Sequence, residues 1–129
     1  MTIVLTHTES ETYFHNALCN SLGEMRYYGL SLDFDGKAYK KAKAKLEKEN
    51  KSICYEDVFM QLLRDGGTLT MVDEEYDGEY TRSITIKDVH DRVAMTPLSH
   101  LTDMINEQDD ATTGDVILQS VFYEEVIFG

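Results

Sequence analysis

An acidic run that ends in glycine has part of the spacing of a calcium-binding loop. Asp73, Glu75, Asp77 and Gly78 stand where positions one, three, five and six of an EF-hand loop would be. The twelfth position, which needs a bidentate glutamate, would be Ile84. We therefore expect no metal ion at this run, and the sequence as a whole predicts no metal and no cofactor. Solvated acids that protect an exposed strand edge explain the run more simply.

The lysine-rich segment 36–52 is the second group of charged residues. It carries seven lysines and two acids, and Lys37, Lys40 and Lys41 lie in its first half. A lysine helix could contact phosphate, because such contacts depend mainly on positive charge. However, the segment contains no arginine, the residue best suited to reading bases, and the whole chain has a formal net charge of −12. Direct nucleic-acid binding is therefore not expected.

Histidines and cysteines are the residues most able to support catalysis. His15, His90, His100 and Cys54 are the candidates for a site assembled in space, but none lies in a zinc-protease or CxxC pattern. The serines form no nucleophile-elbow motif, and the glycines form no phosphate-binding loop. The isolated Cys19 and Cys54 suggest buried free thiols. The sequence therefore predicts no catalytic residues, with a small hydrolase or transferase as an alternative.

The acidic run must be positioned by a β-hairpin over 68–76 and 79–86. Asp77-Gly78 suits a two-residue type I′ turn, which needs positive φ at both positions. This turn places four pairs opposite each other on one face: Leu69 and Ile86, Met71 and Ile84, Asp73 and Arg82, and Glu75 and Tyr80. The base of that face is apolar, while the other face is mostly polar, as expected for a half-buried hairpin.

The other elements follow from hydrophobic spacing and capping residues. The predicted elements are a strand over 2–6, a helix from 9 to 23, a strand over 28–34, helices over 36–49 and 52–64, a short helix from 88, a helix from 97, and a helix over 116–127 for which a strand stays open. Mixed strands and helices without regular alternation predict an α+β fold. We expect a single domain over 1–129, in which a small antiparallel or mixed sheet packs against five or six helices.

The composition suggests a cytoplasmic protein with no membrane partner. The N-terminus lacks the basic and apolar regions of a signal peptide. No apolar run approaches the length of a membrane-spanning helix. Only two cysteines are present, fewer than small secreted scaffolds usually carry.

Charge is the feature that bears most on function. Residues 53–129 carry 17 acids and four bases, in contrast to the lysine segment. We expect a non-enzymatic protein-interaction module with an acidic surface, and a homo-oligomer is one form this could take because the two charged groups are complementary. The proposed interaction surface comprises Asp73, Glu74, Glu75, Asp77, Glu79, Lys37, Lys40 and Lys41.

Two further alternatives stay open. The same acids, with Asp109 and Asp110, could imitate nucleic-acid phosphates and inhibit a DNA-handling or defence enzyme. Tyrosines could instead line a small-molecule pocket. The tyrosines not required by an apolar stripe are Tyr27, Tyr28, Tyr76 and Tyr123.

Overall fold

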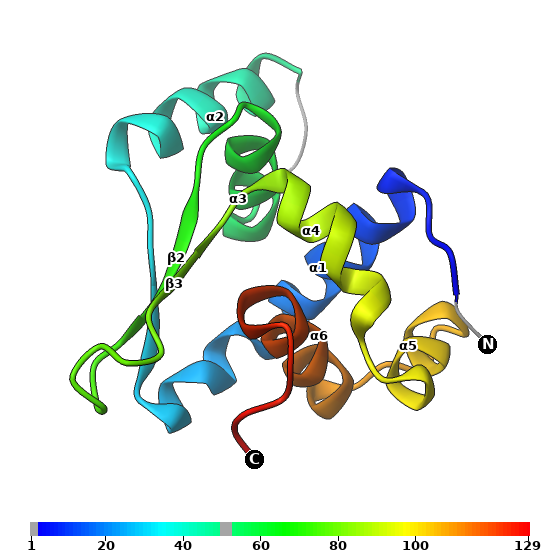
Figure 1. Cartoon of the computed structure of the whole chain (residues 1–129). Helices are drawn as coiled ribbons and strands as arrows, with labels where there is room; N and C mark the ends of the chain where they lie inside the picture. Colours follow the sequence, from blue (N-terminus) through cyan, green and yellow to red (C-terminus); the bar gives the residue numbers. More distant parts are fainter. Residues whose placement is uncertain (1–2, 50–52) are drawn as a thin grey trace.

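The computed structural model describes residues 3–49 and 53–129, and these form an α+β fold with six α-helices and a three-stranded antiparallel sheet. The elements in chain order are α1 (His7–Ser21), the 3-10 helix η1 (Leu22–Tyr28), β1 (Leu30–Asp33), α2 (Gly36–Lys48), α3 (Tyr55–Arg64), β2 (Leu69–Asp73), β3 (Arg82–Ile84), α4 (Ile86–Arg92), the 3-10 helix η2 (Val93–Met95), α5 (Leu98–Ile105) and α6 (Ala111–Tyr123). Figure 1 shows the sheet on one side of the molecule and most helices on the other.

The sheet has the order β1-β2-β3, with β2 in the centre. At one end Leu30 lies opposite Asp73, and toward the other end Asp33 lies opposite Thr70. Leu69 and Ile84 face each other and are fully buried, and Met71 is 1% exposed on the same side. The predicted apolar face of the hairpin is therefore confirmed at Leu69, Met71 and Ile84, whereas Ile86, its fourth predicted member, begins α4.

The predicted hairpin register is wrong by two residues. Leu69 pairs with Ile84 rather than with Ile86, and Met71 pairs with Arg82. A shift of two residues keeps every side chain on its original face, which is why the burial prediction survives. The turn itself forms: Asp77 and Gly78 have φ of 55° and 80°, and the amide of Glu79 donates to the carbonyl of Tyr76.

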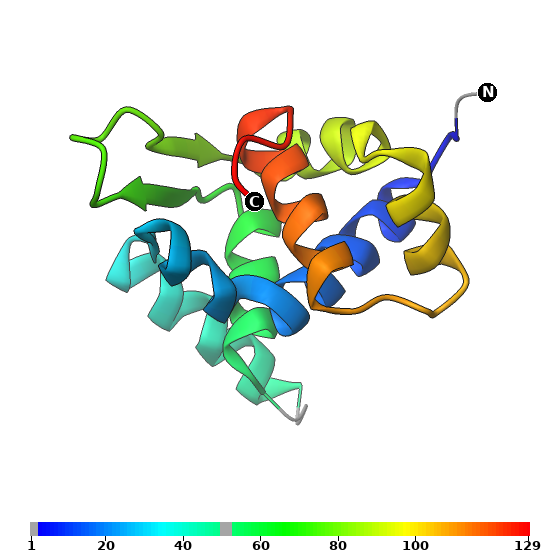
Figure 2. The same cartoon turned by 90° about the horizontal axis from the view of Figure 1, so that it is seen from below.

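Local hydrogen bonds explain why the strands stop short of this turn. The amide of Glu74 donates to the carbonyl of Gly29, and Thr81 Oγ1 accepts from the amide of Asp73. Asp73 and Arg82, which the predicted register places opposite each other, form no ion pair within the described residues, since Arg82 donates to the carbonyls of Glu79 and Thr81. Residues 74–81 are thus a loop that extends beyond the sheet, as Figure 2 shows.

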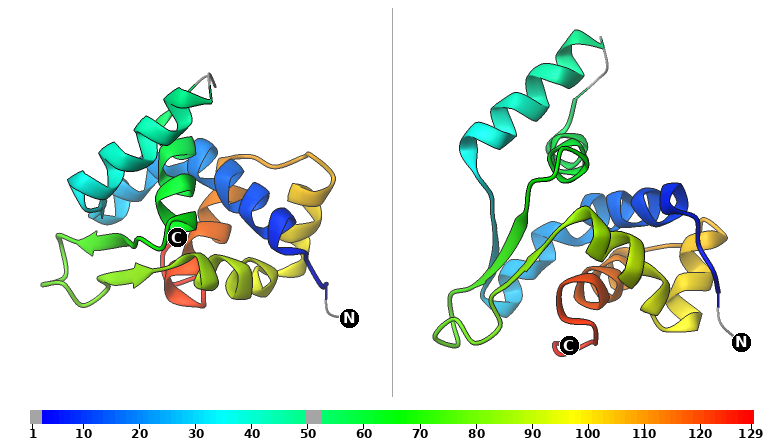
Figure 3. Two further views of the ribbon diagram at one scale, coloured as in Figure 1. Left: turned by 90° about the horizontal axis from the view of Figure 1, so that it is seen from above. Right: turned by 45° about the horizontal axis from the view of Figure 1, so that its top comes forward.

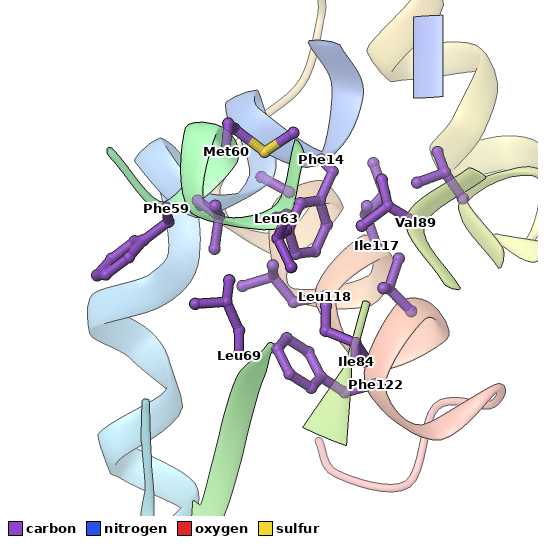
Figure 4. Close-up of a cluster of buried hydrophobic side chains, with 14 of the residues drawn as sticks. Phe14, Phe59, Met60, Leu63, Leu69, Ile84, Val89, Ile117, Leu118 and Phe122 are labelled. Carbon is purple, nitrogen blue, oxygen red and sulfur yellow. The ribbon is translucent and has the colours of Figure 1, made fainter. Parts of the chain in front are cut away.

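Helices α1 and α6 form the most extensive helix pair of the fold, and Gly114 allows them to approach closely. A Cβ at Gly114 would lie 2.3 Å from Ser21 Oγ, which itself donates to the carbonyl of Ala111. The apolar faces of the two helices include Phe14, Leu118 and Phe122. Figure 4 shows these side chains meeting Leu69 and Ile84 from the sheet, so a single core joins the helices to the strands.

Helix α3 lies between α1 and α2, while α2 lies at the edge of the molecule (Figure 3). Asp35 caps α2 by accepting from the amide of Lys37, as its position in the sequence predicts. Only Ala42 and Leu46 of α2 are fully buried, Ala38 and Tyr39 are half-buried against the core, and α3 is the element that α2 contacts most. The exposed faces of α2 carry its lysines.

Several predicted boundaries are corrected. Residues 3–6 form no strand, and residues 1–2 lie outside the described part of the chain. Thr6 forms the capping box with Glu9, so α1 begins at His7 rather than at residue 9. Helical structure does not end at Gly23, as predicted, but continues as the 3-10 helix η1 to Tyr28.

Later in the chain, α3 begins after Cys54, and Ser52, its predicted start, lies outside the described residues. Asp110 caps α6, which ends at Tyr123, so the helix prediction for this segment holds over most of its length.

Candidate functional site

Four exposed acids project from the loop beyond the hairpin, and we call them the acidic tip. They are Glu74, Glu75, Asp77 and Glu79. Glu74 accepts a hydrogen bond from Ser31 Oγ at 3.0 Å. Gly29, with φ of 75°, fixes the loop against β1, because a Cβ there would lie 2.6 Å from the side chain of Glu75.

Asp73 belongs to the predicted acidic surface but is only 5% exposed. Its carboxylate accepts three backbone hydrogen bonds, from the amides of Glu75, Tyr76 and Tyr80, at 2.8 to 3.1 Å. Burial opposes ionisation, but these amides outweigh it and lower the pKa of Asp73 below its ordinary value. Asp73 therefore holds the loop in shape rather than facing a partner.

The lysines of α2 lie near the opposite end of the sheet from the acidic tip. Lys37, Lys40 and Lys41, which we call the basic end, are exposed and make no ion pair within residues 3–49 and 53–129. Further along α2, Lys45 pairs with Asp65 at 2.9 Å. The two charged groups predicted from the sequence are therefore separated by the length of β2 and do not neutralise each other within the molecule (Figure 1).

A polar row that the sequence analysis missed runs along α1. His7, Glu11, His15 and Cys19 recur every four residues, so they lie along one side of the helix. Residues from α3 and α4 lie across from this row. The partners that contact it are Arg64, Asp57 and His90.

The N-terminal half of this row is held by Glu11. Its carboxylate accepts from Arg64 Nε at 2.6 Å and lies 2.8 Å from His90 Nε2. The His7 ring stacks on His90 at 3.8 Å between centroids. Burial opposes ionisation of Glu11, but the hydrogen bonds from His90 and Arg64 prevail and lower its pKa. Arg64 supplies the positive charge that this carboxylate needs.

The C-terminal half of the row has a different composition. His15 Nε2 lies 2.8 Å from Asp57 Oδ1, and Cys19 Sγ lies 3.9 Å from the other ring nitrogen, His15 Nδ1. Cys54 caps α3, and Asp57 closes the capping box by accepting from its amide. One ligand atom from each of His15, Cys54 and Asp57 lies within 4.8 Å of the others.

Cys19, His15 and Asp57 place a thiol, an imidazole and a carboxylate in series, the arrangement that cysteine hydrolases use for catalysis. A nucleophile must be a thiolate, yet partial desolvation by neighbouring atoms and the carboxylates of Glu56 and Asp57 raise the pKa of the Cys19 thiol. Partial desolvation is also the largest cause that raises the pKa of Cys54 to about 11. Both thiols therefore stay protonated at neutral pH, and a protonated thiol is a poor nucleophile, so these residues do not favour nucleophilic catalysis.

Both thiols are exposed, which corrects the prediction that they are buried. Of the four candidates for a catalytic site, His15 and Cys54 come together, His90 lies with Glu11, and His100 lies separately on α5. The spacing of His15 and Cys19 was visible in the sequence, but Asp57 lies 42 residues from His15. Only the packing of α1 on α3 brings them together.

Three of the four tyrosines considered for a ligand pocket, Tyr28, Tyr76 and Tyr123, pack around a C-terminal segment of the same chain, and Tyr27 does not. The ring of Phe128 packs against four tyrosine rings, with 5.0 to 6.3 Å between ring centroids: those of Tyr28, Tyr76, Tyr80 and Tyr123. Gln119, 1% exposed, holds this segment by accepting from the amides of residues 127 and 128. Tyr27 and Tyr28 border a small cavity of about 110 Å³.

The remaining mimicry acids lie elsewhere in the fold. Asp109 accepts from Asn20, and Asp110 caps α6, so neither continues the acidic tip. No helix in the described part of the chain has the length and apolar character needed to cross a bilayer. The chain matches no protein-family model, no curated protein and no solved structure.

Proposed function

We propose that this chain is a non-enzymatic protein-interaction module that works through its two charged ends, and that a second copy of the chain is one partner. The observation that carries the proposal is the separation of unpaired charge. The basic end and the acidic tip lie at opposite ends of the sheet, and neither finds an ion-pair partner within the described residues. A contact between copies would pair them.

Two arrangements of copies would pair the basic end with the acidic tip. In a head-to-tail contact each copy uses one end toward each neighbour, and in a two-fold dimer both pairs of ends meet in one interface. Complementary charges steer such encounters and are screened by salt. The acidic tip is also held by Asp73 and Gly29, so it presents its carboxylates without first becoming ordered.

Light scattering of the purified chain at two salt concentrations tests this proposal. We expect association at low ionic strength, weakened at least about tenfold between ~50 mM and ~500 mM salt because exposed charges are screened. The variant K37E/K40E/K41E should be monomeric, and so should E74K/E75K/E79K. The matched control K37R/K40R/K41R keeps the charge and should associate normally.

A mixture of the two charge-reversed variants, K37E/K40E/K41E and E74K/E75K/E79K, tests directly whether the basic end of one copy binds the acidic tip of another. One variant keeps the acidic tip and the other keeps the basic end, so the mixture should associate although each alone does not. The proposal would be contradicted if the wild-type chain is monomeric at low salt, or if its association is equally strong at low and high salt.

A further inference from the structure

A set of ligand atoms suited to a transition metal lies where α1 meets the start of α3. The set contains an imidazole, a thiol and a carboxylate, from His15, Cys54 and Asp57. Nitrogen, sulfur and oxygen donors of this kind suit zinc, whereas calcium and magnesium prefer oxygen alone. Together the thiolate and the carboxylate would balance the double charge of the ion.

The distances fit a tetrahedral centre after a small movement of side chains. Two atoms bound to one zinc ion at about 2.0–2.3 Å lie roughly 3.3–3.8 Å apart. The three ligand atoms lie within 4.8 Å of one another. His15 Nε2 and Asp57 Oδ1 lie only 2.8 Å apart, so these two atoms must separate slightly to bind one ion.

The surroundings distinguish this cluster from the other histidine cluster of the same row. Glu11 and His90 also lie 2.8 Å apart, but Arg64 binds the same carboxylate and would repel a cation. Asp57 has no lysine or arginine ion pair within residues 3–49 and 53–129. The side chains of His15 and Asp57 are 29% and 36% exposed, which leaves a path for an ion.

We propose that His15, Cys54 and Asp57 bind one zinc ion, and that Cys19 orients His15 from the side. Zinc takes His15 Nε2, the nitrogen that faces Asp57, and the other nitrogen carries a proton directed at Cys19 Sγ. On binding, the Cys54 thiol loses its proton to solvent and its sulfur donates an electron pair to the ion. Three protein ligands leave one position for water or a partner's side chain.

The test uses the full chain, stripped of metal by a chelator and titrated with cobalt(II). We expect one cobalt per chain, with a near-ultraviolet thiolate-to-cobalt band and the visible bands of a tetrahedral ion. Zinc should displace the cobalt, while excess calcium or magnesium should not. Competition with a chromophoric chelator then gives the zinc affinity of each variant.

Four variants identify the ligands. C54S and H15A should each lower zinc affinity by at least about tenfold, and C54S should also lose the thiolate band. C54S is the sharpest change, since serine is a favoured helix N-cap and leaves α3 intact. C19S should keep the band, because Cys19 is not a ligand and the serine hydroxyl still offers an acceptor to His15 Nδ1. H100A, a histidine change on α5, is the matched control and should bind normally.

Circular dichroism of each metal-free variant confirms that it is folded. Absence of a cobalt spectrum in the wild type overturns the proposal. So does a thiolate band that survives in C54S and disappears in C19S. This site is independent of the charged ends, so its failure leaves the proposed interaction untouched.

Discussion

Asp73 illustrates how one buried carboxylate determines the shape of an exposed loop. Its three amide donors come from residues two, three and seven positions later in the chain. Protonation would remove much of this hydrogen bonding, since a neutral carboxyl group is a weaker acceptor. The group therefore links the conformation of the acidic tip to pH.

The variant D73N should be less stable than wild type at neutral pH, because an amide cannot replace the ionised acceptor of three amides. The folded-state pKa of Asp73 is lowered, so its contribution is present above the ordinary value of 3.8 and is lost as pH falls through the lowered folded value. The difference in melting temperature between the two proteins should therefore shrink below about pH 4. A difference that stays constant down to pH 2 would contradict this role.

At the scale of elements, the register of β2 and β3 can be measured directly. Leu69 and Ile84 lie opposite each other and are fully buried. Each of L69A and I84A should lower the free energy of unfolding by about 2–5 kcal/mol. The double variant should show a coupling energy of about 0.5–3 kcal/mol in urea unfolding, because the two side chains are in contact.

The control for this cycle is Ile86, which the sequence prediction placed opposite Leu69. Ile86 begins α4 instead. The effects of L69A and I86A should therefore be nearly additive. A larger coupling of Leu69 to Ile86 than to Ile84 would show that the register is the one predicted from the turn.

Elements defined by local signals could be predicted, while those defined by distant contacts could not. The helix over 36–49 was predicted within one residue, because Asp35 caps it through the neighbouring amide of Lys37. The predicted hairpin register was wrong because the amides that follow Asp73 bond elsewhere. The amide of Glu75 donates to the Asp73 carboxylate, and the amide of Glu74 donates to the carbonyl of Gly29. The strand predicted over 2–6 has a β-branched sequence, but residues 3–6 have no strand beside them in the described structure.

The same distinction applies to the sites. The acidic tip and the basic end are runs of charge, so their exposure could be predicted from the sequence, whereas Asp73, predicted to share that surface, is buried. The cluster of His15, Cys54 and Asp57 depends on how two helices pack, and no short spacing encodes it.

For the whole molecule, the close crossing of α1 and α6 is the contact most sensitive to side-chain size. G114V should lower the free energy of unfolding by about 1–3 kcal/mol, because new methyl groups would displace Ser21 and separate the helices. G36A is the control, since a Cβ at Gly36 meets nothing within 4 Å. Equal stability of G114V and wild type in urea unfolding would contradict this packing.

The position of α2 at the edge has a consequence for how the molecule opens. Helix α2 packs mainly against α3, through buried Ala42 and Leu46 and half-buried Ala38 and Tyr39, so its detachment would leave the contacts of α1, α6 and the sheet in place. Such sub-global opening requires less free energy than complete unfolding. We therefore expect the backbone amides of the lysine-bearing helix to become accessible to solvent while α1, α6 and the sheet stay folded.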